Sequence, residues 1–111
     1  MRSIFTSRID VEEWEPDAET GGLVHLLRAD DSIQAGVWRP GPAAGRVIEL
    51  VLEAEETLLV LDGRGRLEID GERAIELRPG VALSMRKGTR TRWTVDDDFR
   101  EFWVYSLTAP G

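Results

Sequence analysis

The chain has no cysteine and only one histidine, His25, among its 111 residues. The missing cysteines exclude disulfides, thiolate metal sites and cysteine nucleophiles, and they fit a reducing cytoplasm. His25 lies in the run LVHLLRA at residues 23–29, flanked by leucines and without a partner at metal-ligand spacing. A Ser-His-Asp set needs a suitably placed histidine, which this sequence does not offer. We therefore expect His25 to have a structural role.

Long apolar runs and an excess of positive charge are missing as well. No window reaches the roughly 20 apolar residues that cross a membrane, and the N-terminal stretch MRSIFTSRIDVEEWEP lacks the apolar segment of a secretory signal. The chain has 14 Lys and Arg against 21 Asp and Glu, a formal net charge of −7. This charge repels phosphate backbones and anionic membrane surfaces. We expect a soluble cytoplasmic protein that binds neither nucleic acid nor membranes.

Short alternating runs interrupted by glycine and proline make up most of the sequence. They lie at residues 23–29, 32–38, 46–52, 57–63, 67–77, 81–85, 91–95 and 99–107. In the segment 67–77, Asp70 and Gly71 suit a two-residue hairpin turn in which both residues have positive φ. Many short strands at close spacing are typical of a sandwich or barrel of the jelly-roll kind. We predict an all-β fold with one barrel at 23–111 and an N-terminal arm at 1–22 that packs on it.

Several of these segments contain residues that resemble the cupin superfamily. They are AGVW at 35–38, Glu56 with Gly63, Pro79-Gly80, Gly88 with Trp93, and FWVY at 102–105. The pattern is similar in particular to the small ureidoglycine-aminohydrolase-like and ethanolamine-utilisation-like single-domain cupins, and it covers nearly the whole chain from Val11 onward. The resemblance implies a single cupin (RmlC-like) double-stranded β-helix, a jelly-roll barrel with an internal pocket.

The resemblance also implies where a metal would be held. In metal-binding cupins a first motif supplies two histidines and a glutamate, and a second motif supplies another histidine. Glu56 matches the glutamate by its spacing to Gly63, but residues 49–53 contain no histidine and Thr91 takes the place of the second-motif histidine. Because a catalytic zinc normally needs three protein ligands, we predict no metal and no other cofactor.

An all-oxygen site is the alternative, since Glu49, Glu53 and Glu56 offer donors that magnesium, calcium or manganese prefer. On a regular strand Glu49 and Glu53 share a face, whereas Glu56 lies beyond a turn. This separation favours glutamates that serve the surface and the rim.

Glu56 is the first candidate functional residue. Leu58 and Val60 share its face in the run TLLVLDG, so the cupin register points Glu56 into the barrel. A carboxylate among apolar neighbours either meets a cation or has a raised pKa, and a raised pKa makes Glu56 a candidate general acid or base. The alternative is a buried structural ion pair with Arg86 or Arg92.

The resemblance places other candidate ligand contacts near Glu56. Arg86 stands where family members usually carry proline, at the pocket mouth, and its planar fork suits an anionic group. The basic run RKGTRTR at 86–92 is alternatively a solvated hairpin tip. Tryptophans suit an aromatic wall, but filling the interior of a small barrel is their more common use. The candidate ligand-binding residues are Trp38, Glu49, Arg86, Thr91, Arg92 and Trp93.

Three functions are compatible with these residues. The leading hypothesis is a small-molecule-binding cupin of unknown specificity, without metal, whose ligand lies inside the barrel and has an anionic group read by Arg86 or Arg92. The alternative, implied by the aminohydrolase-like and sugar-isomerising relatives, is a hydrolase or isomerase of a small polar metabolite that uses Glu56 as acid or base. A second alternative is a non-catalytic interaction scaffold. We also expect a homodimer, because pairing would cover an exposed edge strand.

Overall fold

The computed structural model describes residues 3–71 and 73–107, and their regular secondary structure is almost entirely β-strand. The strands are β1 (Glu15–Pro16), β2 (Leu23–Ala29), β3 (Ile33–Arg39), β4 (Ile48–Val51), β5 (Glu55–Asp62), β6 (Gly65–Ile69), β7 (Arg73–Leu77), β8 (Ala82–Met85), β9 (Arg90–Val95) and β10 (Arg100–Ser106). A single 3-10 turn, η1 (Gly41–Ala43), lies between β3 and β4. The described residues include no helix of the length and apolar character that a membrane crossing requires. The predicted all-β fold is confirmed.

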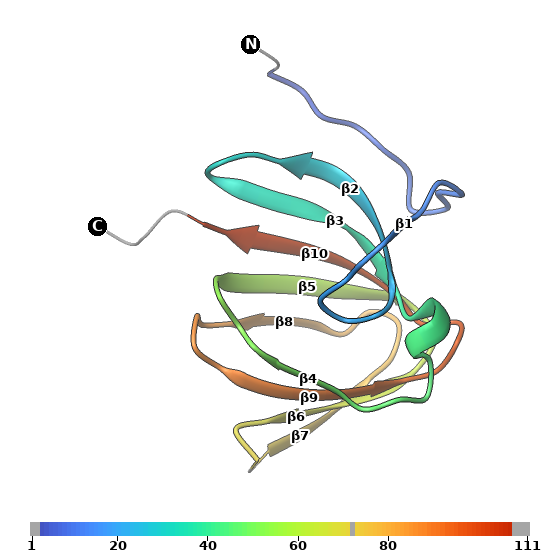
Figure 1. The fold of residues 1–111 in the computed structure, drawn as a ribbon, viewed down its shortest axis with the longest axis vertical. Coiled ribbons are helices and arrows are strands. Elements are labelled where there is room, and N and C mark those ends of the chain that lie inside the picture. The colour runs from blue at the N-terminus through green and yellow to red at the C-terminus, as the bar shows by residue number, and fades with distance from the viewer. Residues whose placement is uncertain (1–2, 72, 108–111) are drawn as a thin grey trace.

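Two antiparallel sheets face each other across the core. The larger sheet has the strand order β1-β2-β3-β10-β5-β8, and the smaller sheet has the order β4-β9-β6-β7. In Figure 1 the smaller sheet lies below the larger one, and the chain passes repeatedly from one to the other, for example from β3 to β4 and from β9 to β10. This alternation between sheets makes the predicted jelly-roll barrel.

The hairpin of β6 and β7 has the predicted positive φ values at its tip, but its turn is longer than predicted. Asp70 has φ 53° and Gly71 has φ 73°. The last paired residues are Ile69 and Arg73, so three residues connect the strands instead of two. Asp70 also contacts β9, because its amide donates to the Arg90 carbonyl at 2.8 Å and its carboxylate accepts from the Arg90 amide at 3.0 Å. These bonds hold the longer tip against β9.

The hydrophobic core fills one end of the space between the sheets. Leu58, Leu67, Leu77, Val95 and Phe99 are almost completely buried there. Strand residues point alternately to opposite faces, and at this end of the barrel the inward-facing positions are apolar. Toward the other end, the inward-facing side chains become polar and aromatic, and a cavity remains between them.

The N-terminal arm extends the larger sheet. In β1, Glu15 pairs with Val24 and Pro16 pairs with Leu23, which adds a two-residue edge strand beside β2. On the outer face of β2, the His25 ring is hydrogen-bonded to the Ser7 hydroxyl at 2.9 Å and to the Glu13 carbonyl at 3.0 Å. His25 therefore ties the arm to the barrel, in agreement with the structural role expected of it.

Candidate functional site

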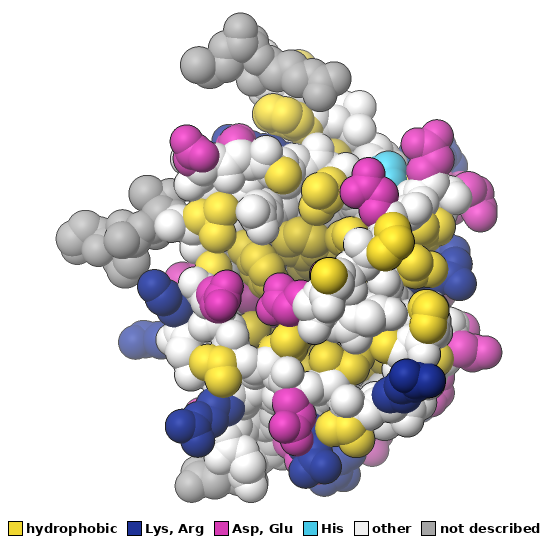
Figure 2. Space-filling model, viewed as in Figure 1, with side chains coloured by type: hydrophobic (Ala, Val, Ile, Leu, Met, Phe, Trp, Pro, Cys, Tyr) yellow, Lys and Arg dark blue, Asp and Glu magenta, His cyan; other side chains and the backbone are white. Residues whose placement is uncertain are grey.

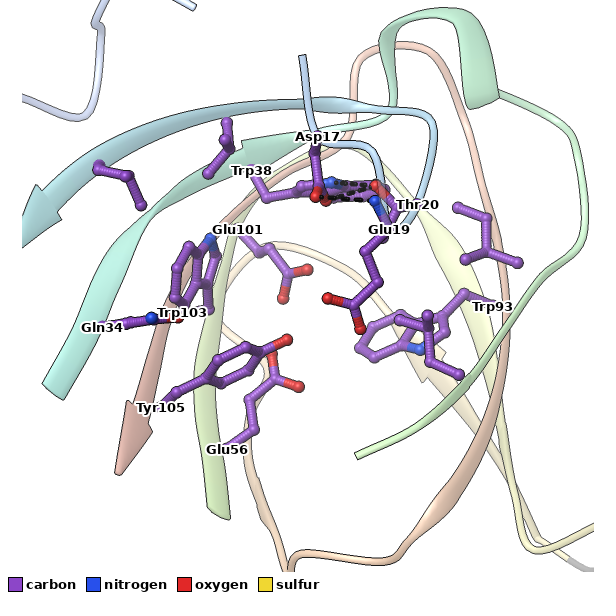
Figure 3. Close-up of a pocket in the computed structure, with 14 residues that line it drawn as sticks. Asp17, Glu19, Thr20, Gln34, Trp38, Glu56, Trp93, Glu101, Trp103 and Tyr105 are labelled. Atoms are coloured by element: carbon purple, nitrogen blue, oxygen red, sulfur yellow. Dashed lines mark hydrogen bonds between the residues drawn. The ribbon is translucent and has the colours of Figure 1, made fainter. Parts of the chain in front are cut away.

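A cavity of about 170 Å³ opens between the two sheets. It is bounded by β2, β3, β10 and β5 on one side, by β4 and β9 on the other, and by the turn that joins β1 to β2 (Figure 3). Its lining combines carboxyl groups, aromatic rings and a few polar and aliphatic side chains: Asp17, Glu19, Thr20, Val24, Leu26, Gln34, Trp38, Ile48, Leu50, Glu56, Trp93, Glu101, Trp103 and Tyr105.

Two neighbouring strands bring carboxyl groups into this cavity. On β10, Glu101 and Tyr105 are four positions apart in the sequence and share the inward face. On β5, Glu56 pairs directly with Tyr105, and side chains of such cross-strand partners start roughly 5 Å apart. Figure 3 shows the side chains of Glu56, Glu101 and Tyr105 directed into the same space. The sheet register therefore groups two acids and a phenol at one place.

Burial changes the acidity of all three groups. Glu56 is 4% exposed and Glu101 is 5% exposed. Burial raises the pKa of Glu56 to about 7, and the negative charge of Glu19 adds to the effect. Burial, followed by the charge of Glu56, raises the pKa of Glu101 well above its usual range, and the same two causes raise the pKa of Tyr105. The two carboxyl groups therefore hold their protons to higher pH than exposed glutamates do.

Glu101 has an unused hydrogen-bonding atom. Its Oε2 is buried, and none of the described residues gives it a hydrogen bond. An unsatisfied buried polar atom costs about 1–3 kcal/mol. The described residues that line the cavity include no Arg, Lys or His. The buried ion pair weighed in the sequence analysis is therefore not formed by these residues, and Arg92 instead lies 3.6 Å from Glu49.

One wall of the cavity is fixed by hydrogen bonds to the turn before β2. The indole N–H of Trp38 donates to the Thr20 hydroxyl oxygen at 2.9 Å. That hydroxyl donates in turn to the Asp17 carboxylate at 2.6 Å and accepts from the Gly22 amide at 3.0 Å. The turn is thereby held against β3, with the Glu19 carboxyl directed toward the cavity in Figure 3.

The opposite wall depends on Thr91 and Trp93. The indole N–H of Trp93 donates to the Thr91 hydroxyl oxygen, and this hydroxyl donates to the Leu50 carbonyl, both at 2.9 Å. Thr91 is buried behind the wall and does not line the cavity. Its hydroxyl therefore orients the Trp93 ring and joins β9 to β4.

Besides Thr91, three predicted ligand-binding residues do not line the cavity. Glu49 and Arg92 are cross-strand partners on β4 and β9, and their side chains are 71% and 55% exposed on the outer face of the smaller sheet. They point outward because Leu50 and Trp93, their chain neighbours, point inward. Arg86 is exposed in the turn between β8 and β9 and does not line the cavity. The expected approach of these arginines to the pocket is not observed.

Sequence reasoning identified Glu56, Trp38 and Trp93, which line the cavity, but missed Glu101 and Tyr105. A signal was available, since the strand REFWVYS places both residues on one face, with Trp103 between them. The residues from the turn before β2 had no such signal, because their position depends on how the arm folds over the barrel.

The cavity does not have the donors of a histidine-rich metal site. Where the first-motif histidines were expected, Leu50 and Leu52 are aliphatic, and Glu49 and Val51 are exposed. The Thr91 hydroxyl donates a hydrogen bond to the backbone carbonyl of Leu50. Among residues 3–71 and 73–107, no group of three His, Cys, Asp or Glu is arranged to hold a metal ion. The residues present thus do not fit the metal of metal-binding cupins.

Comparison with known proteins agrees with the architecture. The sequence profile of the EutQ-like cupin domain matches residues 27–103. The EutQ protein of Clostridium difficile is 19% identical with a TM-score of 0.66, covering 84% of this chain and 67% of that one. An RmlC-like cupin from Shewanella frigidimarina is 15% identical with a TM-score of 0.74, covering 96% of this chain and 94% of that one.

A third similar structure is KdgF from Halomonas sp., which is 19% identical with a TM-score of 0.68 and 94% coverage of both chains. No curated protein matches the sequence. At these identities the structural likeness shows a shared fold, and the sequence profile shows the family.

Proposed function

This chain belongs to the family of EutQ-like cupin domains, and we propose that it binds a small polar metabolite inside its barrel without a histidine-held metal. One observation carries the proposal: Glu56 and Glu101 are buried, face an open cavity and receive no basic side chain from the described lining residues. The cavity of about 170 Å³ is close to the roughly 150 Å³ that accommodates benzene in an engineered protein cavity. A ligand of that size fits.

A metal-independent acid–base enzyme is the second candidate, favoured by the pKa of about 7 at Glu56. A general acid or base works best when its pKa is near the working pH. Glu101 and Tyr105 lie beside Glu56 and provide further proton donors. In such an enzyme, Glu56→Gln would abolish turnover while ligand still binds, whereas in a binding protein it would change only affinity and its pH dependence.

The open cavity favours binding or catalysis over a scaffold role. We retain the expectations of a cytoplasmic location and of a homodimer. Among the described strands, β8 lies at one edge of the larger sheet, and β4 and β7 are the edges of the smaller sheet. Pairing between copies would protect such edges. Light scattering of the purified chain would measure its mass in solution, and a monomer would contradict the dimer.

A matched pair of variants tests whether ligand enters the cavity. Leu26 lines the cavity and is 45% exposed, and Leu59 lies outside it and is 40% exposed. Leu26→Trp should block the mouth at little cost in stability, and Leu59→Trp adds the same bulk elsewhere on the larger sheet. A library of small polar metabolites is screened by thermal shift on the wild-type chain, and hits are measured by calorimetry on all three proteins.

We expect hits whose affinity is lost in Leu26→Trp and kept in Leu59→Trp. The same untagged protein, purified without chelators, is analysed for metal by elemental mass spectrometry, where we expect only traces of manganese, zinc, iron and nickel. Hits that survive in Leu26→Trp, or no hits at all, would refute binding in the cavity. Near-stoichiometric metal would refute the metal-free form of the proposal.

A further inference from the structure

We propose that the ligand is a small organic cation, with an ammonium-type head group held between the carboxylates of Glu56 and Glu101 and the surrounding aromatic rings. The inference rests on the proposed binding function and specifies its ligand class. The observation behind it is a pocket that combines acids and aromatic rings and has no basic side chain among its described lining residues.

All the charged side chains among the described residues that line the cavity are acidic. Glu56 and Glu101 lie deep between the sheets, and Asp17 and Glu19 come from the turn before β2. Figure 3 shows the carboxyl groups of Glu19, Glu56 and Glu101 directed toward the middle of the cavity. Figure 2 shows hydrophobic side chains in a hollow on this face with acidic side chains beside it, while Lys and Arg lie toward the periphery. Such a field attracts cations and repels anions.

Aromatic rings supply the second element of cation recognition. Trp38, Trp93, Trp103 and Tyr105 all line the cavity, and the rings of Trp103 and Tyr105 are 4.8 Å apart between centroids. A cation within about 6 Å of a ring centroid is attracted by the negative face of the ring, by about 2 kcal/mol or more once water is excluded. Rings together with carboxylates are how proteins recognise ammonium groups with methyl substituents.

The unpartnered oxygen of Glu101 gives the cation a specific position. Glu101 Oε2 is buried, lacks a hydrogen bond from the described residues and belongs to a side chain directed into the cavity. A buried carboxylate needs hydrogen bonds, a nearby cation or a proton to offset the loss of water. An ammonium group beside Glu101 would provide the missing charge, and its N–H groups, where it has them, would donate to this oxygen.

Anionic and neutral ligands fit this environment less well. An anion would lie against carboxylates, since the exposed Arg86 and Arg92 are outside the cavity. A neutral ligand would leave the carboxyl pair to be neutralised by protons alone. Only a cation satisfies both the carboxylates and the aromatic faces.

The same geometry fixes how affinity depends on pH. Asp17 and Glu19 face Glu56 from the turn before β2, and Glu101 and Tyr105 face it from β10. The described lining residues of β2, β3, β4 and β9 contribute no titratable group, and Met85 of β8 is the cross-strand partner of Glu56. A cation prefers the deprotonated carboxylates, so its affinity rises as pH increases through about 7, the pKa of Glu56. An anion would show the opposite slope.

Three probes of nearly equal shape separate these possibilities. Choline carries the cation, 3,3-dimethylbutan-1-ol is its neutral isostere, and 3,3-dimethylbutanoate is an anionic counterpart. Binding to the full chain is followed by tryptophan fluorescence and calorimetry at about pH 6 and about pH 8, on either side of the Glu56 pKa. We expect choline to bind at least about tenfold more tightly than the neutral isostere, and more tightly at the higher pH.

Variants locate the binding and keep the two proposals separable. Glu56→Gln keeps the shape of the side chain and removes the charge that Glu56 gains above about pH 7, so choline affinity at about pH 8 should fall about tenfold or more, while Glu49→Gln on the outer face should leave it unchanged. A neutral or anionic probe that binds as tightly as choline, and is lost in Leu26→Trp, would overturn the cation inference and leave the proposed function standing. No saturable binding of any probe at millimolar concentration would also overturn the inference, and the metabolite library would then decide the proposed function alone.

Discussion

The chain places glutamates in two environments. Glu56 and Glu101 lie inside the barrel, and Glu49 lies on its outer face. The interior pair is almost completely buried and has no basic partner among the described lining residues. Glu49 is mostly exposed and lies 3.6 Å from Arg92. Burial raises the pKa of both interior acids, whereas water screens the outer pair. We therefore expect function in the cavity, where an ionised side chain loses its contact with water. The charged side chains of the basic run 86–92 remain in contact with solvent.

Strand β9 separates the two environments within six residues. Thr91, Trp93 and Val95 are buried on the cavity side, and Arg92 and Thr94 are exposed on the other. In a strand that alternates so strictly, each residue faces the opposite side of the sheet from its chain neighbours. The variants below use neighbouring positions to test how far the inner and outer faces differ.

The largest difference is expected between Trp93 and its neighbour Arg92. Trp93→Ala removes a buried ring that walls the cavity and donates a hydrogen bond to Thr91, so unfolding free energy should fall by about 3–5 kcal/mol. Arg92→Ala, one residue away on the exposed face, should change it by no more than about 1 kcal/mol, because it removes only the exposed pair with Glu49. Urea denaturation of both variants measures the two values. Similar losses in the two variants would show that β9 does not separate an inner from an outer face.

The second difference concerns pH, and it compares Glu56 with Glu49. Folding raises the pKa of Glu56 from 4.5 to about 7, so between these values the folded chain binds more protons than the unfolded chain. Stability from this group is present below about pH 4.5 and is lost as pH rises through about 7, by up to about 3 kcal/mol. Glu56→Gln cannot ionise and should be more stable than the wild type at about pH 8.

Glu49→Gln is the matched control for this measurement, because the side chain of Glu49 is exposed. Denaturant unfolding at several pH values between about 4.5 and 8 gives the slope for each protein. The wild type and Glu49→Gln should lose stability in parallel as pH rises, and Glu56→Gln should lose less. Parallel slopes in all three proteins would show that the Glu56 carboxyl is not perturbed in the folded state.

The fold was predictable because local signals agree with one another. Alternating runs placed nearly every strand, and Asp70 with Gly71 marked a hairpin tip whose positive φ values are observed. The tip is one residue longer than expected, and Asp70 bonds to the backbone of Arg90, a contact between segments distant in sequence. Patterns of period two describe a strand and its faces, but they do not report such contacts.

The site was only partly predictable, for a related reason. The register of β5 indicated that Glu56 faces inward, and Glu56 lines the cavity. The inward position of Glu101 and Tyr105 follows from the same parity on β10, but their grouping with Glu56 depends on the pairing of β10 with β5. Arg86 was predicted to lie at the pocket mouth from the cupin resemblance alone, and it is exposed in a turn. Residues were therefore predicted best where strand parity and resemblance agreed.

The smallest effect is expected for the outer pair itself. Glu49 and Arg92 are more than half exposed and 3.6 Å apart, and exposed pairs of this kind contribute about 0.2–1 kcal/mol. A double-mutant cycle with Glu49→Gln and Arg92→Gln should give a favourable coupling within that range, and added salt should reduce it. The same cycle on Glu56→Gln and Glu101→Gln, repeated at increasing pH, should give a coupling of opposite sign once both acids are ionised, because removing either buried charge then relieves the other. A strong, salt-resistant coupling in the outer pair would mean that the outer face, like the cavity, holds its charges away from water.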